Sequence, residues 1–212
     1  MIDFKHITTI KDLRIVEARK LISAVGRATL QKCLLEGAAN IEHGLDVCMH
    51  IEHVFYRVAA HDDRFIAQLI HKGIPCYAVS DGILKKITHT AEVFPYIGVA
   101  DLPEALGEAM DNVVLVIEHI QSHYILGALI RAASALGIRD ILSIDPHLDL
   151  FYRRIVSASA GTVFNARVKR FYSGREALEM LEQQDYRLVA TSPLSRSFEA
   201  IAIFQRESLV LT

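Results

Sequence analysis

Apolar positions in the second half of the chain fall into short runs separated by segments with helical spacing. The runs are VVLVIEHI, DILSID, NARVKRF, YRLVATS and SLVLT, and they contain few polar residues, as strands buried on both faces do. The segments with helical spacing are LGALIRAASALG, LDLFYRRIVSAS and GREALEMLEQQ. From residue 112 onward this alternation predicts a parallel sheet covered by helices on both faces.

The first half alternates in a similar way with shorter elements. IKDLRIVEARKLISAV predicts one long amphipathic helix, and DRFIAQLIHKG predicts a helix that ends at Gly73. Predicted strands are TLQKCLLEG, IEHVFYRVA, IPCYAVS and FPYIGVADLP. The last of these runs into DLPEALGEAM, which is expected to be a linker that turns helical. We therefore predict two α/β domains, residues 1–107 and residues 108–212, the second with a Rossmann-like sheet.

Composition places the protein among globular chains. The 212 residues are 51% hydrophobic, which is ample for a core, and the mean hydropathy is +0.26. No stretch approaches the roughly 18 uncharged apolar residues of a membrane helix, and the N-terminus carries scattered charges rather than the apolar core of a signal peptide. Cys33, Cys48 and Cys76 lie in apolar surroundings without CxxC spacing, which indicates buried free thiols. We expect a cytoplasmic protein with no membrane contact.

The net charge of −2 hides two basic stretches. Residues 1–32 contain seven Lys or Arg and three acids, and residues 150–175 contain six basic residues and no acid. Basic patches suit a polyanionic partner such as RNA. The other interpretation, which the sequence leaves open, is a solvated face whose counter-charges come from elsewhere in the fold. Basic residues of the second stretch that we name as candidate RNA contacts are Arg153, Arg154, Lys169 and Arg170.

Gly127 and Arg131 form a candidate site. Gly127 follows a predicted strand and is expected to open a helix, the geometry in which backbone N–H groups hold an anion. Arg131 lies one helical turn further on, from where its guanidinium is expected to reach back as a bidentate phosphate clamp. Neither GxGxxG nor a P-loop is present, so close packing for Gly127 and plain solvent exposure for Arg131 remain open alternatives.

Ten histidines raise the question of a metal site, above all in EHGLDVCMHIEH. A zinc site needs three or four ligands that converge on one point, whereas here a predicted helix, AANIEHGLDVCMH, gives way to the predicted strand IEHVFYRVA across the cluster. We therefore expect no metal. The sequence also lacks the GxSxG pattern of a nucleophilic serine, and nothing marks a serine or cysteine as activated.

Two segments together resemble the SpoU (TrmH-type) family of RNA ribose 2'-O-methyltransferases. LGALIRAASALGIRDILSID is similar to the family's first motif, with Gly127 and Arg131, and RRIVSASAGTVFNARV is similar to its ASxGxxF segment, which includes Ser159. The N-terminal half resembles the small RNA-recognition domain that precedes many of these catalytic domains. The resemblance spans nearly the whole chain, although only the motif around Arg131 is specific.

The resemblance implies methyl transfer from S-adenosylmethionine to a ribose 2'-hydroxyl of rRNA or tRNA. Arg131 matches the family's catalytic arginine, which would position and polarise that oxygen. Gly127 and Ser159 are expected to contact RNA together with the basic residues named above. Thr191 and Ser192 are carried over as contacts at the edge of the cofactor. A homodimer is possible, since members of the family dimerise.

The sequence also departs from the family's pattern. Ile125 stands where an asparagine is usual, and Ser122-His123 replaces Asp-Pro. The family's later glycine-rich loop and Ser-Leu-Asn segment do not occur in these 212 residues. We therefore expect weak or no cofactor binding and no complete C-terminal knot. A non-catalytic RNA-binding protein is the alternative function, and a nucleotide-binding α/β protein unrelated to RNA is a third.

Overall fold

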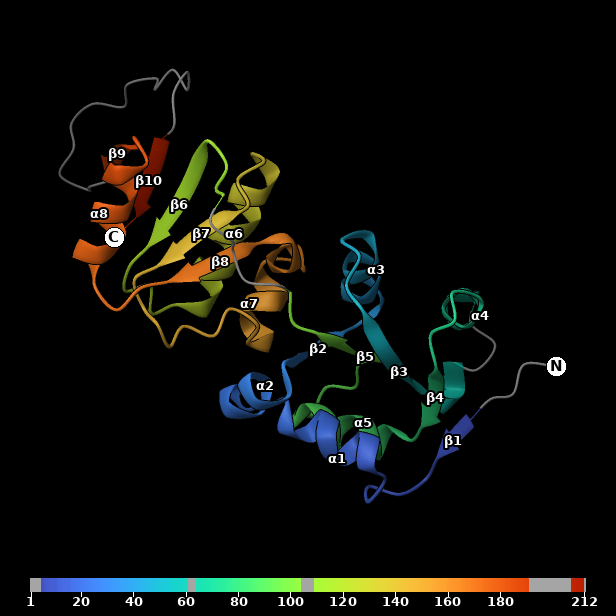
Figure 1. Ribbon diagram of the computed structural model, residues 1–212. Helices are drawn as coiled ribbons and strands as arrows, with labels where there is room; N and C mark the ends of the chain where they lie inside the picture. The colour runs from blue at the N-terminus through green and yellow to red at the C-terminus, as the bar shows by residue number, and fades with distance from the viewer. Residues whose placement is uncertain (1–4, 61–63, 104–108, 191–206, 212) are drawn as a thin grey trace. The chain divides into compact units, whose positions relative to one another are not determined.

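The computed structural model describes residues 5–60, 64–103, 109–190 and 207–211. It divides into two compact units, Met1–Leu102 with Phe151–Arg153, and Pro103–Leu150 with Arg154–Thr212. Each unit has its own five-stranded sheet with helices packed on it (Figure 1). The predicted α/β fold class is confirmed. The boundary predicted after residue 107, and the helical turn predicted there, lie outside the described residues.

The first unit is built on a mixed sheet with strand order β1-β4-β3-β5-β2. Its elements are β1 (Lys5–Ile7), α1 (Leu13–Lys20), α2 (Ala24–Leu30), β2 (Lys32–Glu36), α3 (Ala38–Asp46), β3 (Ile51–Arg57), η1 (Val58–Ala60), α4 (Arg64–His71), β4 (Cys76–Val79), α5 (Asp81–Thr88) and β5 (Tyr96–Asp101). Strands β1, β4 and β3 are parallel, and β5 runs antiparallel to both of its neighbours, β3 and β2. The sequence pattern missed β1, which is only three residues long.

The long N-terminal helix predicted from the sequence is in fact two helices. Helix α1 ends at Lys20, and α2 begins after Ser23, whose side chain accepts a hydrogen bond from the Gly26 amide at 3.0 Å. A serine N-cap satisfies an amide that the first turn of a helix leaves unpaired, and so it favours a new start at this point. A Cβ atom at Gly26 would lie 1.9 Å from the Lys20 carbonyl oxygen, so the tight connection requires glycine.

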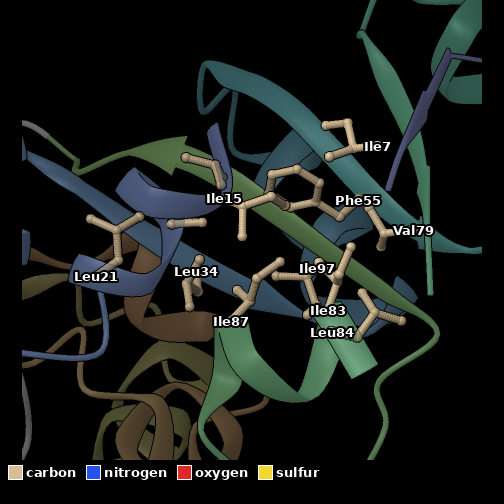
Figure 2. Close-up of a cluster of buried hydrophobic side chains, with 12 residues drawn as sticks. Ile7, Ile15, Leu21, Leu34, Phe55, Val79, Ile83, Leu84, Ile87 and Ile97 are labelled. Atoms are coloured by element: carbon tan, nitrogen blue, oxygen red, sulfur yellow. The ribbon is translucent and has the colours of Figure 1, made fainter. Parts of the chain in front are cut away.

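The core of the first unit lies between its sheet and the two helices α1 and α5. Figure 2 shows Ile15 from α1 and Ile83 and Ile87 from α5 pointing toward Phe55 and Ile97 of the sheet. All five side chains are buried. Burial of a side chain of this size stabilises the fold by about 1.5–3 kcal/mol, so this cluster fixes α1 and α5 side by side on one face of the sheet.

His53 is a buried histidine on β3. Its ring lies 4.7 Å from the Phe55 ring and 5.8 Å from the Tyr77 ring, both edge to face, and the residue is 4% exposed. Burial lowers its pKa from the ordinary 6.5 to about 4, although the neighbouring Glu52 carboxylate acts in the opposite direction. His53 is therefore neutral in the folded protein at neutral pH.

This burial makes folding sensitive to mild acid. As the pH falls through 6.5 the unfolded chain protonates His53, whereas the folded protein does so only near pH 4, so stability is lost between these values. The loss reaches about 1.4 kcal/mol per pH unit. Between pH 7.5 and pH 5 we expect the wild type to lose about 2 kcal/mol more than His53→Phe in urea unfolding. The exposed-histidine control His71→Gln should behave as the wild type, and an identical pH profile for His53→Phe would contradict a neutral buried ring.

The second unit contains a fully parallel sheet with strand order β8-β7-β6-β10-β9. Its elements are β6 (Val113–Ile117), α6 (His123–Ala135), β7 (Asp140–Ser143), α7 (Arg153–Ala158), η2 (Thr162–Asn165), β8 (Arg167–Arg170), α8 (Gly174–Gln183), β9 (Arg187–Ala190) and β10 (Glu207–Leu211). All five predicted strands are present. The strand order reverses between β6 and β10, which places a topological switch point at their carboxyl ends, where open α/β sheets bind ligands.

Both faces of this sheet are covered. Helix α8 contributes Ala177 and Leu181 to a cluster with Val114 and Val116 of β6 and Leu142 of β7. The intervening residue Leu115 is buried on the opposite face, where right-handed crossovers place α6 and α7. Figure 1 shows α6 and α8 on opposite sides of the strands. The absence of polar residues in β6 (VVLVI) follows from this double coverage.

The three cysteines are free, and two of them, Cys33 and Cys76, are buried as predicted. Cys48 is exposed, which corrects the prediction for that residue. It lies in the connection after α3 with a φ of 60°, where the chain turns toward β3 at the surface. Burial raises the pKa of the Cys76 thiol to about 11. Within the described ranges no helix is long and apolar enough to cross a membrane.

Candidate functional site

Arg131 lies in the third turn of α6, not near its beginning. The helix starts at His123, with the Ser122 side chain accepting a hydrogen bond from the Ile125 amide at 3.3 Å. Arg131 is eight residues beyond that start, about 12 Å along the helix axis. The expectation that its guanidinium reaches back to the helix N-terminus was therefore wrong, because the serine cap begins the helix one turn before Gly127.

The Arg131 side chain is nevertheless available to a ligand. The residue is exposed, and the described part of the chain provides no carboxylate or hydrogen-bond acceptor for its guanidinium. An arginine that the fold leaves unpaired keeps all five N–H donors for a phosphate or an oxyanion. Arg131 therefore remains a candidate contact on the exposed side of α6.

Gly127 is a packing residue inside α6. It is buried, and a Cβ atom there would lie 2.5 Å from the Ala158 Cβ atom and 2.8 Å from the Ile155 carbonyl oxygen of α7. Because Gly127 is in the second helical turn, its amide does not belong to the free N-terminal amides that hold anions. The expectation that Gly127 opens the helix was wrong, and its burial leaves no surface for RNA.

Gly127→Ala is expected to destabilise the second unit. The new methyl group must displace backbone atoms of α7, a cost of about 1–3 kcal/mol that exceeds the gain in helix propensity of roughly 0.5–1 kcal/mol. Gly82→Ala is the matched control, because a Cβ atom at that helical glycine would meet only the Ser80 hydroxyl at 3.8 Å. In urea unfolding the control should be neutral or stabilising. Equal stability of the two variants would contradict the tight α6–α7 contact.

The structure brings the two segments of the family resemblance together. Gly127 packs against Ala158 and the Ser159 amide at the end of α7, and α6 also contacts η2. Ser159 is fully buried, and its hydroxyl donates to the Val156 carbonyl at 3.0 Å. The prediction that Ser159 contacts RNA therefore conflicts with its burial. Helix α7 ends at Ala158, and Ala160 and Gly161 follow with φ values of 51° and 81°.

Two of the six basic residues between 150 and 175 are held by carboxylates. In the first unit, the Arg153 guanidinium donates to Glu36 at 2.9 Å, so its candidacy as an RNA contact is weakened. In the second unit, the Arg167 Nε atom donates to Asp140 at 2.6 Å, and Asp111 lies 3.0 Å from the same guanidinium. The hydrogen bond to Asp140 raises the pKa of Arg167, which keeps it charged.

The other four basic residues of this stretch have no carboxylate partner among the described residues. They are Arg154, Lys169, Arg170 and Arg175. Arg170 is exposed and directs its guanidinium to the Leu148 carbonyl at 3.4 Å, and Lys169 lies 5.8 Å above the Phe171 ring. Counter-charges from elsewhere in the fold, the alternative that the sequence left open, are thus found in this stretch for Arg153 and Arg167.

The carboxyl edge of the second sheet carries polar groups that the sequence analysis did not single out. Glu118 follows β6, and its carboxylate lies within 3.8 Å of where a Gly174 Cβ atom would stand. Tyr124 at the start of α6 is 75% exposed, and Tyr172 after β8 is 83% exposed. In the sequence, the available signal for this edge was the presence of aromatic residues shortly after predicted strands. The predicted cofactor contacts Thr191 and Ser192 lie outside the described residues.

The histidine-rich segment does not converge on one point. His53 is buried among aromatic rings, whereas His50 is exposed and its Nδ1 atom lies 2.7 Å from Asp101. Among the residues that the structure describes, no three His, Cys, Asp or Glu side chains gather as a metal site requires.

The fold defines a doubly wound α/β domain, a class in which ligands bind at the carboxyl ends of the parallel strands. The model of the SpoU rRNA Methylase family matches residues 112–211 of that domain, and the resemblance drawn from the sequence is confirmed. The 23S rRNA (guanosine(2553)-2'-O)-methyltransferase RlmP of Bacillus subtilis is 25% identical over 166 residues, which are 78% of this chain and 65% of that protein. An uncharacterized tRNA/rRNA methyltransferase of Synechocystis is 24% identical over 217 residues, 99% of this chain and 78% of that protein.

Solved structures share the fold of the whole chain. An RNA 2'-O ribose methyltransferase has a TM-score of 0.77 at 24% identity, with 97% of this chain and 80% of that chain covered. An rRNA methyltransferase from Sinorhizobium meliloti, solved with AdoMet bound, has a TM-score of 0.77 at 19% identity and covers 98% of this chain and 80% of its own. Both units therefore occur together in proteins of this architecture.

Proposed function

We propose that this protein transfers a methyl group from S-adenosylmethionine to a ribose 2'-hydroxyl of rRNA or tRNA. The observation that carries the proposal is the family match across the entire parallel sheet, residues 112–211. Relatives named as rRNA or tRNA methyltransferases support the RNA substrate. We propose that the first unit acts as a recognition domain that binds part of the RNA substrate. We also propose that the reaction takes place in the cytoplasm and that the working assembly is a homodimer.

The residues at the switch point fit the cofactor. S-adenosylmethionine would supply an electrophilic methyl group on a positively charged sulfur. Glu118, which follows β6, offers a carboxylate that suits the hydroxyl and amino groups of such a ligand, and its side chain is 35% exposed. Thr191 and Ser192 directly follow β9 and remain candidates for the same ligand. Exposed Tyr124 and Tyr172 provide aromatic faces at this edge for stacking on bases.

Arg131 supplies positive charge for the RNA. The 2'-oxygen forms a bond to the methyl carbon as the carbon–sulfur bond breaks, and the hydroxyl proton leaves to water. Negative charge develops on the oxygen during this step, and an unpaired guanidinium stabilises it and holds a neighbouring phosphate. Because arginine stays protonated at any usable pH, Arg131 acts as an electrostatic and positioning group and not as the base. Arg154, Lys169 and Arg170 are proposed to contact the RNA backbone.

Ile125 is the residue of the described structure that favours a non-catalytic RNA-binding protein. It occupies the asparagine position of the family, is 59% exposed and offers no hydrogen bond. Titration calorimetry with S-adenosylmethionine separates the two functions. Only the enzyme must bind S-adenosylmethionine, and such binding gives a heat signal that saturates. RNA binding at several salt concentrations tests both, since phosphate contacts require affinity to fall as salt rises. No binding of S-adenosylmethionine would overturn the enzymatic proposal.

A further inference from the structure

The first unit contains a basic pocket that the proposed reaction does not use. It lies between α1 and α5, which Figure 1 shows side by side along one face of the first sheet. The cavity is about 520 Å³ in volume, and its lining residues are Arg19, Gly82, Lys85, Lys86, His89 and Thr90. We call it the α1–α5 pocket. The apolar cluster of Figure 2 lies beneath these helices and fixes their spacing.

The charges of the α1–α5 pocket are of one sign. Arg19, Lys85 and Lys86 are permanently cationic at neutral pH, and none of the six lining residues is acidic. Within the described residues none of the three cations has an ion-pair partner. Basic residues in the last turns of α1 and α5 partly compensate the helix dipoles, but that effect does not require them to share one cavity.

Arg19 provides a second, independent indication. Its Nε atom is buried and has no hydrogen-bond partner in the protein. A buried donor without an acceptor costs about 1–3 kcal/mol, which a ligand oxygen would recover. Guanidinium groups bind phosphate oxygens through two parallel N–H donors, so a phosphate in the pocket would satisfy this atom. The aliphatic stems of the two lysines would remain against the helices while their ammonium groups reach the ligand.

We propose that the α1–α5 pocket binds the phosphate backbone of the RNA substrate, at a second site separate from the methyl-transfer site. This inference rests on the proposed function, which supplies a polyanionic substrate. Three cations contributed by two different helices suit several phosphates along a chain. The net charge of the protein is −2, so RNA binding depends on local clusters of cations, of which this pocket is one.

The test compares two double variants in which the same charge is removed. Lys85→Gln/Lys86→Gln removes two cations from the pocket, and the control Arg64→Gln/Lys72→Gln removes two exposed cations of the first unit that lie outside it. A short fluorescein-labelled RNA hairpin is the probe, titrated at several salt concentrations. The pocket variant should bind on the order of tenfold more weakly, with the salt slope reduced by about 0.7 per lost contact, while the control is unchanged.

Arg19→Lys should weaken binding and keep the slope, because it retains the charge and loses the Nε donor.

Two further measurements separate the possible failures. Inorganic phosphate at the phosphate concentration of the RNA should not displace the hairpin, and full displacement would show a site for free phosphate and overturn the inference. Calorimetry with S-adenosylmethionine should give the same heat for wild type and pocket variant. If the wild type binds RNA and S-adenosylmethionine and the pocket variant binds RNA equally well, the pocket proposal fails and the proposed function stands. A wild type without salt-dependent RNA binding overturns both.

Discussion

Arg131→Ala is expected to reduce the rate of methyl transfer by about 10²–10³-fold, the effect of removing one preorganised charge donor from a developing oxyanion. The side chain is exposed and unpaired in the described structure, so its removal leaves no buried partner behind and the melting temperature should stay unchanged. The measurement is transfer of labelled methyl groups to RNA under saturating S-adenosylmethionine.

Two further variants make this result specific. Arg131→Lys retains the charge without the planar fork of donors, and it should recover only part of the rate. Arg175→Ala removes an exposed arginine from α8 on the other face of the same sheet and should retain the wild-type rate. A rate for Arg131→Ala equal to that of Arg175→Ala would remove Arg131 from the mechanism.

Arg167→Ala should produce the largest loss of stability. Asp140 is fully buried, and its main cationic partner is the Arg167 guanidinium at 2.6 Å. Among the described residues, removing the arginine leaves the buried Asp140 carboxylate with only the Asp111 amide as donor. Because the Arg167 side chain is 35% exposed, we expect the lower end of the about 3–5 kcal/mol that breaking a buried pair costs. Urea unfolding monitored by circular dichroism measures the change.

The control for this loss is Arg154→Ala. Arg154 is exposed and has no carboxylate partner among the described residues, so its removal should change stability by less than about 0.5 kcal/mol. Because replacing both members of a buried ion pair with apolar residues is often neutral, Asp140→Leu/Arg167→Leu should recover much of the loss. Equal stability of the Arg167 and Arg154 variants would show that Arg167 does not stabilise the buried Asp140 carboxylate.

The sheet of the second unit was predictable because its inner strands β6 and β7 are short runs that are buried almost throughout. Helix boundaries were less so, since they depend on caps rather than on periodicity. Ser122 begins α6 one turn earlier than expected, and Ser23 separates two helices that share one apolar pattern. Gly127 illustrates the consequence, because one turn of error moves a residue from a free helix end into a packed interface.

Electrostatic partners could not be predicted from the sequence because they lie far apart along it. Arg167 is 27 residues from Asp140, and Arg153 is 117 residues from Glu36. A basic stretch without local acids therefore says nothing about which of its members are free. The α1–α5 pocket could not be predicted for the same reason. Arg19 and Lys85 lie far apart along the sequence, and the core beneath α1 and α5 brings them together.

Methyl transfer itself gives the most direct test of the central claim. The purified chain is incubated with S-adenosylmethionine carrying a deuterated methyl group and with unmodified ribosomal RNA or tRNA, and the RNA is then digested to nucleosides for mass spectrometry. We predict a nucleoside with the labelled methyl group on the ribose 2'-oxygen and loss of that signal in Arg131→Ala. Label found only on a base, or no label although S-adenosylmethionine and RNA both bind, would contradict the proposed activity.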